Sequence, residues 1–329
     1  MAERLGVTQV TQIGIESTEG TAVAANRALP SLSIVPSVKA ENQFFGSNGY
    51  KVDTIMAAGR EWSESKVEGL ATYDELVYLL SSLLAYAAPA QVGATTAYTW
   101  THSPGATTAD TIKTLTVEHG DAVRAHKSAG NRLNELTIAV GKNDTKLSGK
   151  LVGEAISDGI TLTASPTAID QIPILSTDWS IYADALWADL GTTQLLRAFN
   201  ASLKIGPRFV PFFPIDRDQG TSFGGQVEQK TGLTLELEVE ADAAGMGFVT
   251  AMRNSSKKFI RLEAVSDQNA GTATPYSASI DLSVAVKDIK EFKALDGGVY
   301  GYGLTLDAVY DSTSGKWIEA VVVNKRTAL

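Results

Sequence analysis

The chain has 329 residues, 44% of them hydrophobic and 20% charged, which is typical of a folded globular protein. It contains no cysteine and has a net charge of −9, which excludes disulfides and cysteine-ligated metals and argues against tight binding to nucleic acid. The N-terminus lacks a basic start followed by an apolar core, and no apolar run approaches roughly 18–20 residues, so neither a signal peptide nor membrane insertion is expected.

The first predicted elements are a strand at Leu32–Val35 and a long excursion at Pro36–Gly59. The excursion contains Phe44, Phe45 and Tyr50. Aromatic side chains are typical anchors of protein–protein contacts. These three residues are therefore predicted to contact another subunit.

The next unit, Arg60–Ala85, reads as a strand, a tight turn and a helix. Thr72 and Glu75 have the spacing of a capping box, in which each side chain binds the other residue's backbone N–H. Apolar residues then recur at three- and four-residue spacing, which predicts a helix with one buried face. These residues are Tyr73, Leu76, Val77, Leu80, Leu83 and Leu84.

A Pro-, Ala- and Thr-rich run at Ala87–Thr111 follows and is expected to be an irregular insertion. The three histidines, His102, His119 and His126, show no metal-ligand spacing and are interpreted as solvent-exposed loop residues. Without cysteine or a histidine in a recognisable motif, no nucleophilic machinery is predicted.

The second half carries the same pattern, 171 residues further on at its start (191 − 20). Leu32 and Ile34 match Leu203 and Ile205 at that offset, and later Leu136–Val140 is matched with Ile280–Val284. A second excursion, Pro207–Lys230, contains the pair Phe212 and Phe213, which is also predicted to contact another subunit.

The join between the halves is placed near Ser165–Thr177, and Asp178–Phe199 is predicted to be partly helical. The strand Leu233–Glu240 alternates strictly and leads into Asp242 and a second apolar-faced helix. Ser279–Lys287, Tyr300–Val309 and Trp317–Val323 are predicted closing strands. The fold class is therefore mainly β with flanking helices (α+β). We expect two tandem β-barrel or sandwich modules, 1–165 and 166–329, each covered by one helix.

Several of these segments resemble tail tube proteins of long-tailed, non-contractile bacteriophages. The resemblance lies in Gly14–Thr21, the Gly69–Leu80 strand-to-helix junction, Ser279–Val286 and Tyr300–Asn324. It implies a structural virion protein of the phage tail, assembled in the host bacterial cytoplasm, with no enzymatic activity, cofactor or metal.

Such proteins stack as rings into a hollow tube that encloses the tape-measure protein, meets tail terminator and initiator proteins, and conducts genomic DNA to the host. Two modules per chain imply rings of three chains with pseudo-six-fold symmetry, and the excursions are expected to reach neighbouring rings. Glu236, Glu238 and Glu240 share one face of a strand and are predicted to line an acidic lumen, because carboxylates repel phosphate.

Two other functions are compatible with the sequence. One is another self-assembling β-protein, such as a fibre or baseplate module. The other is a carbohydrate-active enzyme that uses a pair of carboxylates.

Overall fold

A computed structural model describes residues 5–217 and 220–329. Strands account for 52% of the residues and helices for 10%, so the chain is mainly β, as predicted. The strands of the first half are β1 (Val10–Ile15), β2 (Arg27–Ala28), β3 (Leu32–Gly46), β4 (Asp53–Leu70), β5 (Ala90–Gln91), β6 (Tyr98–His102), β7 (Leu115–Gly120), β8 (Ala125–Val140), β9 (Thr145–Gly153) and β10 (Ser157–Ile160).

The strands of the second half are β11 (Thr167–Ala168), β12 (Trp179–Asp184), β13 (Ala198–Ile205), β14 (Phe209–Phe212), β15 (Gly225–Glu228), β16 (Leu233–Glu240), β17 (Lys258–Gly271), β18 (Thr274–Ile289), β19 (Lys293–Ala294), β20 (Tyr300–Ala308) and β21 (Ile318–Asn324). The α-helices are α1 (Leu76–Leu83) and α2 (Ala243–Arg253), and the short 3₁₀ turns are η1 (Gly6–Thr8), η2 (Ser176–Asp178), η3 (Trp187–Asp189) and η4 (Asp296–Gly298).

The central feature is a run of eight antiparallel strands, in the order β3, β4, β9, β8, β13, β16, β20 and β18. Because neighbouring residues of a strand point to opposite faces, each row across the sheet has one character. The apolar row is Leu32, Gly69, Leu147, Ile138, Leu203, Leu235, Leu306 and Val286. The adjacent, mostly polar row is Ser33, Glu68, Ser148, Thr137, Lys204, Thr234, Asp307 and Ala285.

The strand pairing of the first half recurs in the second. The matching antiparallel pairs are β3–β4 and β13–β16, β4–β9 and β16–β20, β8–β9 and β18–β20, β7–β8 and β17–β18, β1–β7 and β12–β17, and β10–β8 and β21–β18. The 171-residue offset agrees with these ladders at Leu32 and Leu203. The later match was displaced, because Ile138 corresponds to Val286 and not to Leu282. That shift of four residues keeps every side chain on the same face, so alternation alone could not detect it.

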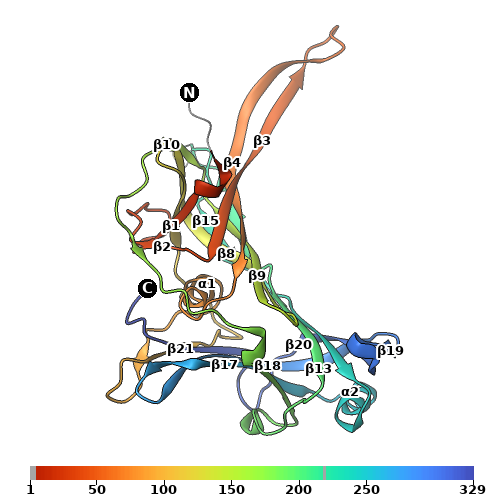
Figure 1. The fold of residues 1–329 in the computed structure, drawn as a ribbon. Helices are drawn as coiled ribbons and strands as arrows, with labels where there is room; N and C mark the ends of the chain where they lie inside the picture. The colour runs from red at the N-terminus through yellow and green to blue at the C-terminus, as the bar shows by residue number, and fades with distance from the viewer. Residues whose placement is uncertain (1–4, 218–219) are drawn as a thin grey trace.

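Helix α1 lies in the middle of the molecule, between the upper strands and the lower layer of the second half (Figure 1). The apolar face is buried as predicted, but the opposite face is buried too, because all eight residues of the helix are enclosed. Its polar groups bind the surrounding strands and loops: Ser82 Oγ accepts from Leu133 N–H (3.0 Å), and the Ser81 carbonyl accepts from Lys113 N–H (2.9 Å). Helix α2, by contrast, is partly exposed and follows Asp242 as predicted; the structure adds that the Asp242 carboxylate accepts from Gly245 N–H and caps the helix.

The capping box at α1 is half formed. Glu75 N–H donates to Thr72 Oγ1 (3.3 Å), as predicted. The carboxylate of Glu75 does not bind the Thr72 backbone N–H. It accepts from the Thr72 hydroxyl (2.9 Å) and from Ser31 N–H (3.0 Å) and so ties the helix start to the segment before β3.

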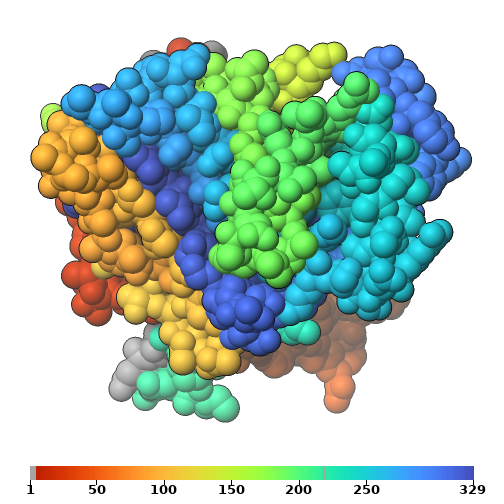
Figure 2. Space-filling view, turned by 90° about the horizontal axis from the view of Figure 1, so that it is seen from below, coloured from red at the N-terminus to blue at the C-terminus, as the bar shows by residue number. Residues whose placement is uncertain are grey.

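Two predicted segments differ from the structure. Ala87–Thr111 is not an irregular insertion, because β6 within it pairs with β21 and Trp100 is fully buried with its indole N–H donating to Asn324 (3.0 Å). From below, this orange-to-yellow segment lies against the blue C-terminal strands (Figure 2). Asp178–Phe199 contains β12 and short 3₁₀ turns instead of a helix, because Trp179–Asp184 pairs along β17.

Replacing Leu80 with alanine is expected to lower the free energy of unfolding by about 2–5 kcal/mol, because the side chain is fully buried within α1. Urea denaturation monitored by tryptophan fluorescence measures the change. Leu70→Ala is the control, since Leu70 is 52% exposed. A loss below about 1 kcal/mol for Leu80→Ala would show that α1 does not carry the core.

Candidate functional site and assembly surfaces

The first excursion forms an arm instead of a loop. Strands β3 and β4 continue as a two-stranded ribbon beyond Ser63, where the pairing of β4 with β9 ends, and the ribbon projects far from the body (Figure 1). The side chain of Phe44 is 60% exposed and that of Tyr50 is 69% exposed. Phe45 is also exposed.

The arm tip is apolar on both faces. Phe44 stands opposite Met56, and Phe45 stands opposite Ile55, so neighbouring cross-strand pairs point to opposite sides of the ribbon. All four side chains are exposed. Ile55 and Met56 were not among the predicted contact residues, because Pro36–Gly59 was interpreted as an excursion and not as two paired strands.

The second excursion folds back onto the molecule. It contains the hairpin β14–β15. Phe212 is exposed, whereas the ring of Phe213 packs edge to face against Trp62 (5.8 Å) and Phe223 (6.2 Å). The two phenylalanine pairs, which look equivalent in the sequence, therefore have different surroundings.

Glu236, Glu238 and Glu240 do lie on one face of β16, but each has a cationic partner. The ion pairs are Glu236 with Lys290 (3.5 Å), Glu238 with Lys293 (3.7 Å) and Glu240 with Arg197 (2.9 Å). The same face carries further pairs, namely Lys204 with Glu135 (3.3 Å), Lys287 with Asp307 (2.7 Å), Lys66 with Glu68 (2.6 Å) and Lys150 with Glu64 (2.9 Å). The face is thus charge-balanced and not simply acidic.

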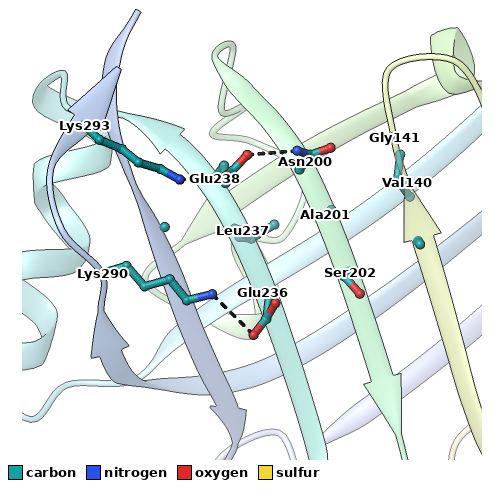
Figure 3. A pocket seen from close by; sticks show the side chains of 12 residues that line it. Val140, Gly141, Asn200, Ala201, Ser202, Glu236, Leu237, Glu238, Lys290 and Lys293 are labelled. Atoms are coloured by element: carbon teal, nitrogen blue, oxygen red, sulfur yellow. Dashed lines mark hydrogen bonds and ion pairs between the residues drawn. The ribbon is translucent and has the colours of Figure 1, made fainter. Parts of the chain in front are cut away.

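A hollow of about 320 Å³ lies on this face, between β8, β13, β16 and the segment after β18. In Figure 3, Lys290 and Lys293 reach over β16 toward Glu236 and Glu238, and Asn200 donates to Glu238 (2.8 Å). Every charged group in the hollow is already paired. Among the described residues, no group of three or more histidines and carboxylates could hold a metal ion.

The eight-stranded sheet ends in two outer edges. On β18, residues 285–289 pair with β20 on one side and have no strand partner on the other side within the described chain. At the β3 edge, side chains bind backbone donors: Ile34 N–H donates to Thr11 Oγ1 (3.2 Å), and just before the strand Ser31 N–H donates to Glu75 (3.0 Å). An edge strand with available backbone groups is a site where another chain can pair.

The histidines are not exposed loop residues. His102 is fully buried in β6 with Nδ1 3.0 Å from the Ala85 carbonyl, and burial lowers its pKa to about 4. His119 and His126 are half-buried and stand opposite each other on β7 and β8. His102 was misinterpreted because Ala87–Thr111 was expected to be irregular, whereas His119 and His126 were assigned to the ends of a hairpin loop although both lie within its paired strands.

Two buried charged groups were not singled out by the sequence analysis. Asp74 is fully buried, neither of its carboxylate oxygens has a hydrogen-bond partner, and burial raises its pKa to about 7. Arg208 is also fully buried; it binds Asp110, Glu228 (2.6 Å) and the Leu83 carbonyl (2.5 Å). Arg208 thereby joins the end of α1, the segment before β7 and the second excursion.

Neither a scan against protein-family models nor a search of curated proteins finds a match for this chain. No helix in the described part is long and apolar enough to cross a membrane.

Asp74→Asn is expected to stabilise the protein above neutral pH. The folded-state pKa is raised above the unfolded value, so the stability contributed by the protonated carboxyl is present below pH 3.8 and is lost as the pH rises through about 7. Because asparagine cannot ionise, the free energy of unfolding of the variant should exceed that of the natural protein by about 2–4 kcal/mol at pH 8. At pH 4 the two values should differ little. Urea denaturation at both pH values measures this; an equal difference at both would refute the assignment.

Arg208→Met is expected to lower the free energy of unfolding by about 3–5 kcal/mol, because it leaves the nearly buried carboxylate of Asp110 without its cationic partner. Arg197→Met removes an exposed ion pair with Glu240 and should cost less than about 1 kcal/mol. Thermal denaturation of the two variants gives the comparison. If both variants lose the same amount of stability, the buried ion pairs of Arg208 do not stabilise the fold more than an exposed ion pair does.

Proposed function

We propose that this chain is a structural virion protein that polymerises as stacked rings into the hollow tail tube of a long-tailed, non-contractile phage. The observation that carries the proposal is the repetition within the eight-stranded sheet. Strands β3, β4, β9 and β8 are followed across the sheet by β13, β16, β20 and β18, which repeat their pairing. We interpret residues 1–165 and 166–329 as two tandem tube-type modules of barrel or sandwich form.

The pairing of β8 with β13 inside the chain suggests how two chains could pair with each other. Inside the chain, Thr137 on β8 stands opposite Lys204 on β13. The equivalent positions in the sheet rows are Ala285 on β18 and Ser33 on β3, which form the two ends of the polar row. A second copy that continues the sheet therefore places its Ser33 opposite Ala285. Three copies joined in this way close a ring with pseudo-six-fold symmetry.

The hydrogen bonds at the β3 edge suit a chain that must stay unpaired until it assembles. Thr11 and Glu75 satisfy backbone donors of Ile34 and Ser31, so this edge is protected in the single chain. On β18 the irregular register between Val286 and Asp288 has the same effect, because a bulge disturbs pairing.

The charge-balanced sheet face is the proposed lumen lining, with Glu236, Glu238 and Glu240 on it. Its lysines are neutralised by neighbouring carboxylates, so DNA phosphates find no cluster of unpaired cations to bind. DNA would then slide through the lumen without specific binding, after the tape-measure protein has left it. Terminator and initiator proteins would bind at the ends of the tube, which forms in the host cytoplasm and stays in the virion.

The arm serves contact between rings in this proposal. Its exposed Phe44, Phe45 and Tyr50 provide apolar area that is buried on a neighbouring ring. Each chain has one such arm, because the second excursion folds back.

Disulfide trapping tests the proposed chain-to-chain contact. The natural chain has no cysteine, so Ser33→Cys combined with Ala285→Cys introduces the only thiols. Ile34 N–H points to the outer side of β3, which puts Ser33 at a non-hydrogen-bonded position, where paired Cα atoms lie about 4.5 Å apart and a disulfide fits. On oxidation of concentrated protein we expect disulfide-linked species that end at three chains.

The matched control is Thr137→Cys with Lys204→Cys, the internal counterpart, which should form a disulfide within one chain. Each single variant, Ser33→Cys alone or Ala285→Cys alone, should give no ladder. If the internal control is oxidised while the Ser33/Ala285 double variant remains a single chain, the proposed ring contact is wrong.

A further inference from the structure

The arm changes direction at a bulge near its root. Glu41 pairs with Arg60 and Gln43 pairs with Ala57, so the single residue Asn42 opposes two residues of β4. Bulges of this kind bend the strand and increase its twist.

The two strands cross very closely at this bulge. A Cβ atom on Gly59 would lie 1.7 Å from the Glu41 carbonyl oxygen, so only glycine fits. Beyond this point the ribbon has no other strand beside it within the described chain, and an isolated two-stranded ribbon is only marginally stable in water.

The second excursion grips the arm at the same place. Glu61 N–H donates to the Thr221 carbonyl (2.9 Å). The Arg60 guanidinium lies 4.7 Å from the centre of the Phe213 ring, which also packs edge to face on Trp62 (5.8 Å). One phenylalanine therefore contacts both residues of β4 that flank Glu61.

The part of the second excursion that contacts the arm is itself packed against the body of the molecule. Phe213 packs against Phe223, which is almost fully buried (1% exposed). Phe213 and Phe223 lie in the loop that connects β14 to β15. This hairpin is held to the core by the buried Arg208, which binds Glu228 on β15. A hollow of about 550 Å³ between the bulge and Gly220–Thr221 leaves space on that side of the arm.

From these contacts we infer that the second excursion is a clasp that sets the direction of the arm, and that the bulge at Glu41–Gln43 and Ala57–Arg60 is the hinge. The two excursions that look alike in the sequence thus have different tasks: the first reaches out and the second holds it. Because the clasp acts within one chain, this inference does not depend on the ring contact proposed above.

The test measures the distance between spin labels on Asn48→Cys at the arm tip and Val123→Cys in the exposed turn before β8, by pulsed electron paramagnetic resonance on dilute, unassembled protein. With the clasp intact, we expect one narrow distance distribution. Phe213→Ala removes the ring from Arg60 and Trp62 and should broaden the distribution and shift its mean.

Arg60→Gln is the second variant; it changes an exposed side chain and should broaden the distribution while the melting temperature stays near that of the natural protein. Phe212→Ala, one residue from Phe213 and outside the ring contacts that hold the arm, should leave the distribution narrow. The clasp is refuted if Arg60→Gln and folded Phe213→Ala both keep the natural distribution, or if Phe212→Ala broadens it as much.

Discussion

The pairing of β8 with β13 is the contact on which the rest of this structure depends. Five residues of each strand, Leu136–Val140 and Ala201–Ile205, lie opposite one another and merge the sheets of the two halves into one. Leu136, Ile138, Leu203 and Ile205 are all buried there. The pairing gives the inner edge of each half a permanent partner, and it leaves the two outer edges, on β3 and β18, at opposite ends of the sheet. In the assembly that we propose, these two outer edges are where further copies of the chain would add.

The halves share their strand pairing but have diverged at their periphery. The first half has the long arm, while the second has the clasp on it. Segment Ala87–Thr111, which has no counterpart in the second half, adds β6 to the edge of the second half's sheet through Trp100 and its neighbours. The helices have diverged too: α1 is enclosed by both halves, and α2 stays at the surface. Through these contacts each half of the chain packs on the other, so neither half is expected to fold in the same way alone.

Sequence periodicity predicted what depends on nearest neighbours. The strand Leu233–Glu240, the helix that follows Asp242 and the strands that end the chain follow from the alternation and spacing of their apolar residues. What failed depends on contacts far apart in the sequence. His102 and Trp100 lie in a Pro-rich run whose strand exists only because β21 is beside it. Trp179 and Tyr182 have helical spacing, yet they lie in a strand because their segment pairs with β17. Lys290 and Lys293 neutralise Glu236 and Glu238 from more than fifty positions away, which no local pattern reveals.

In the assembly that we propose, copies of this chain continue its sheet into a closed ring, and the rings stack around a lumen. Electron microscopy of the assembled protein tests it most directly. We expect hollow tubes whose cross-sections show three chains with pseudo-six-fold symmetry, with the β16 face toward the lumen. Discrete particles without a central channel, or tubes in which β3 and β18 of neighbouring chains lie apart, would contradict it.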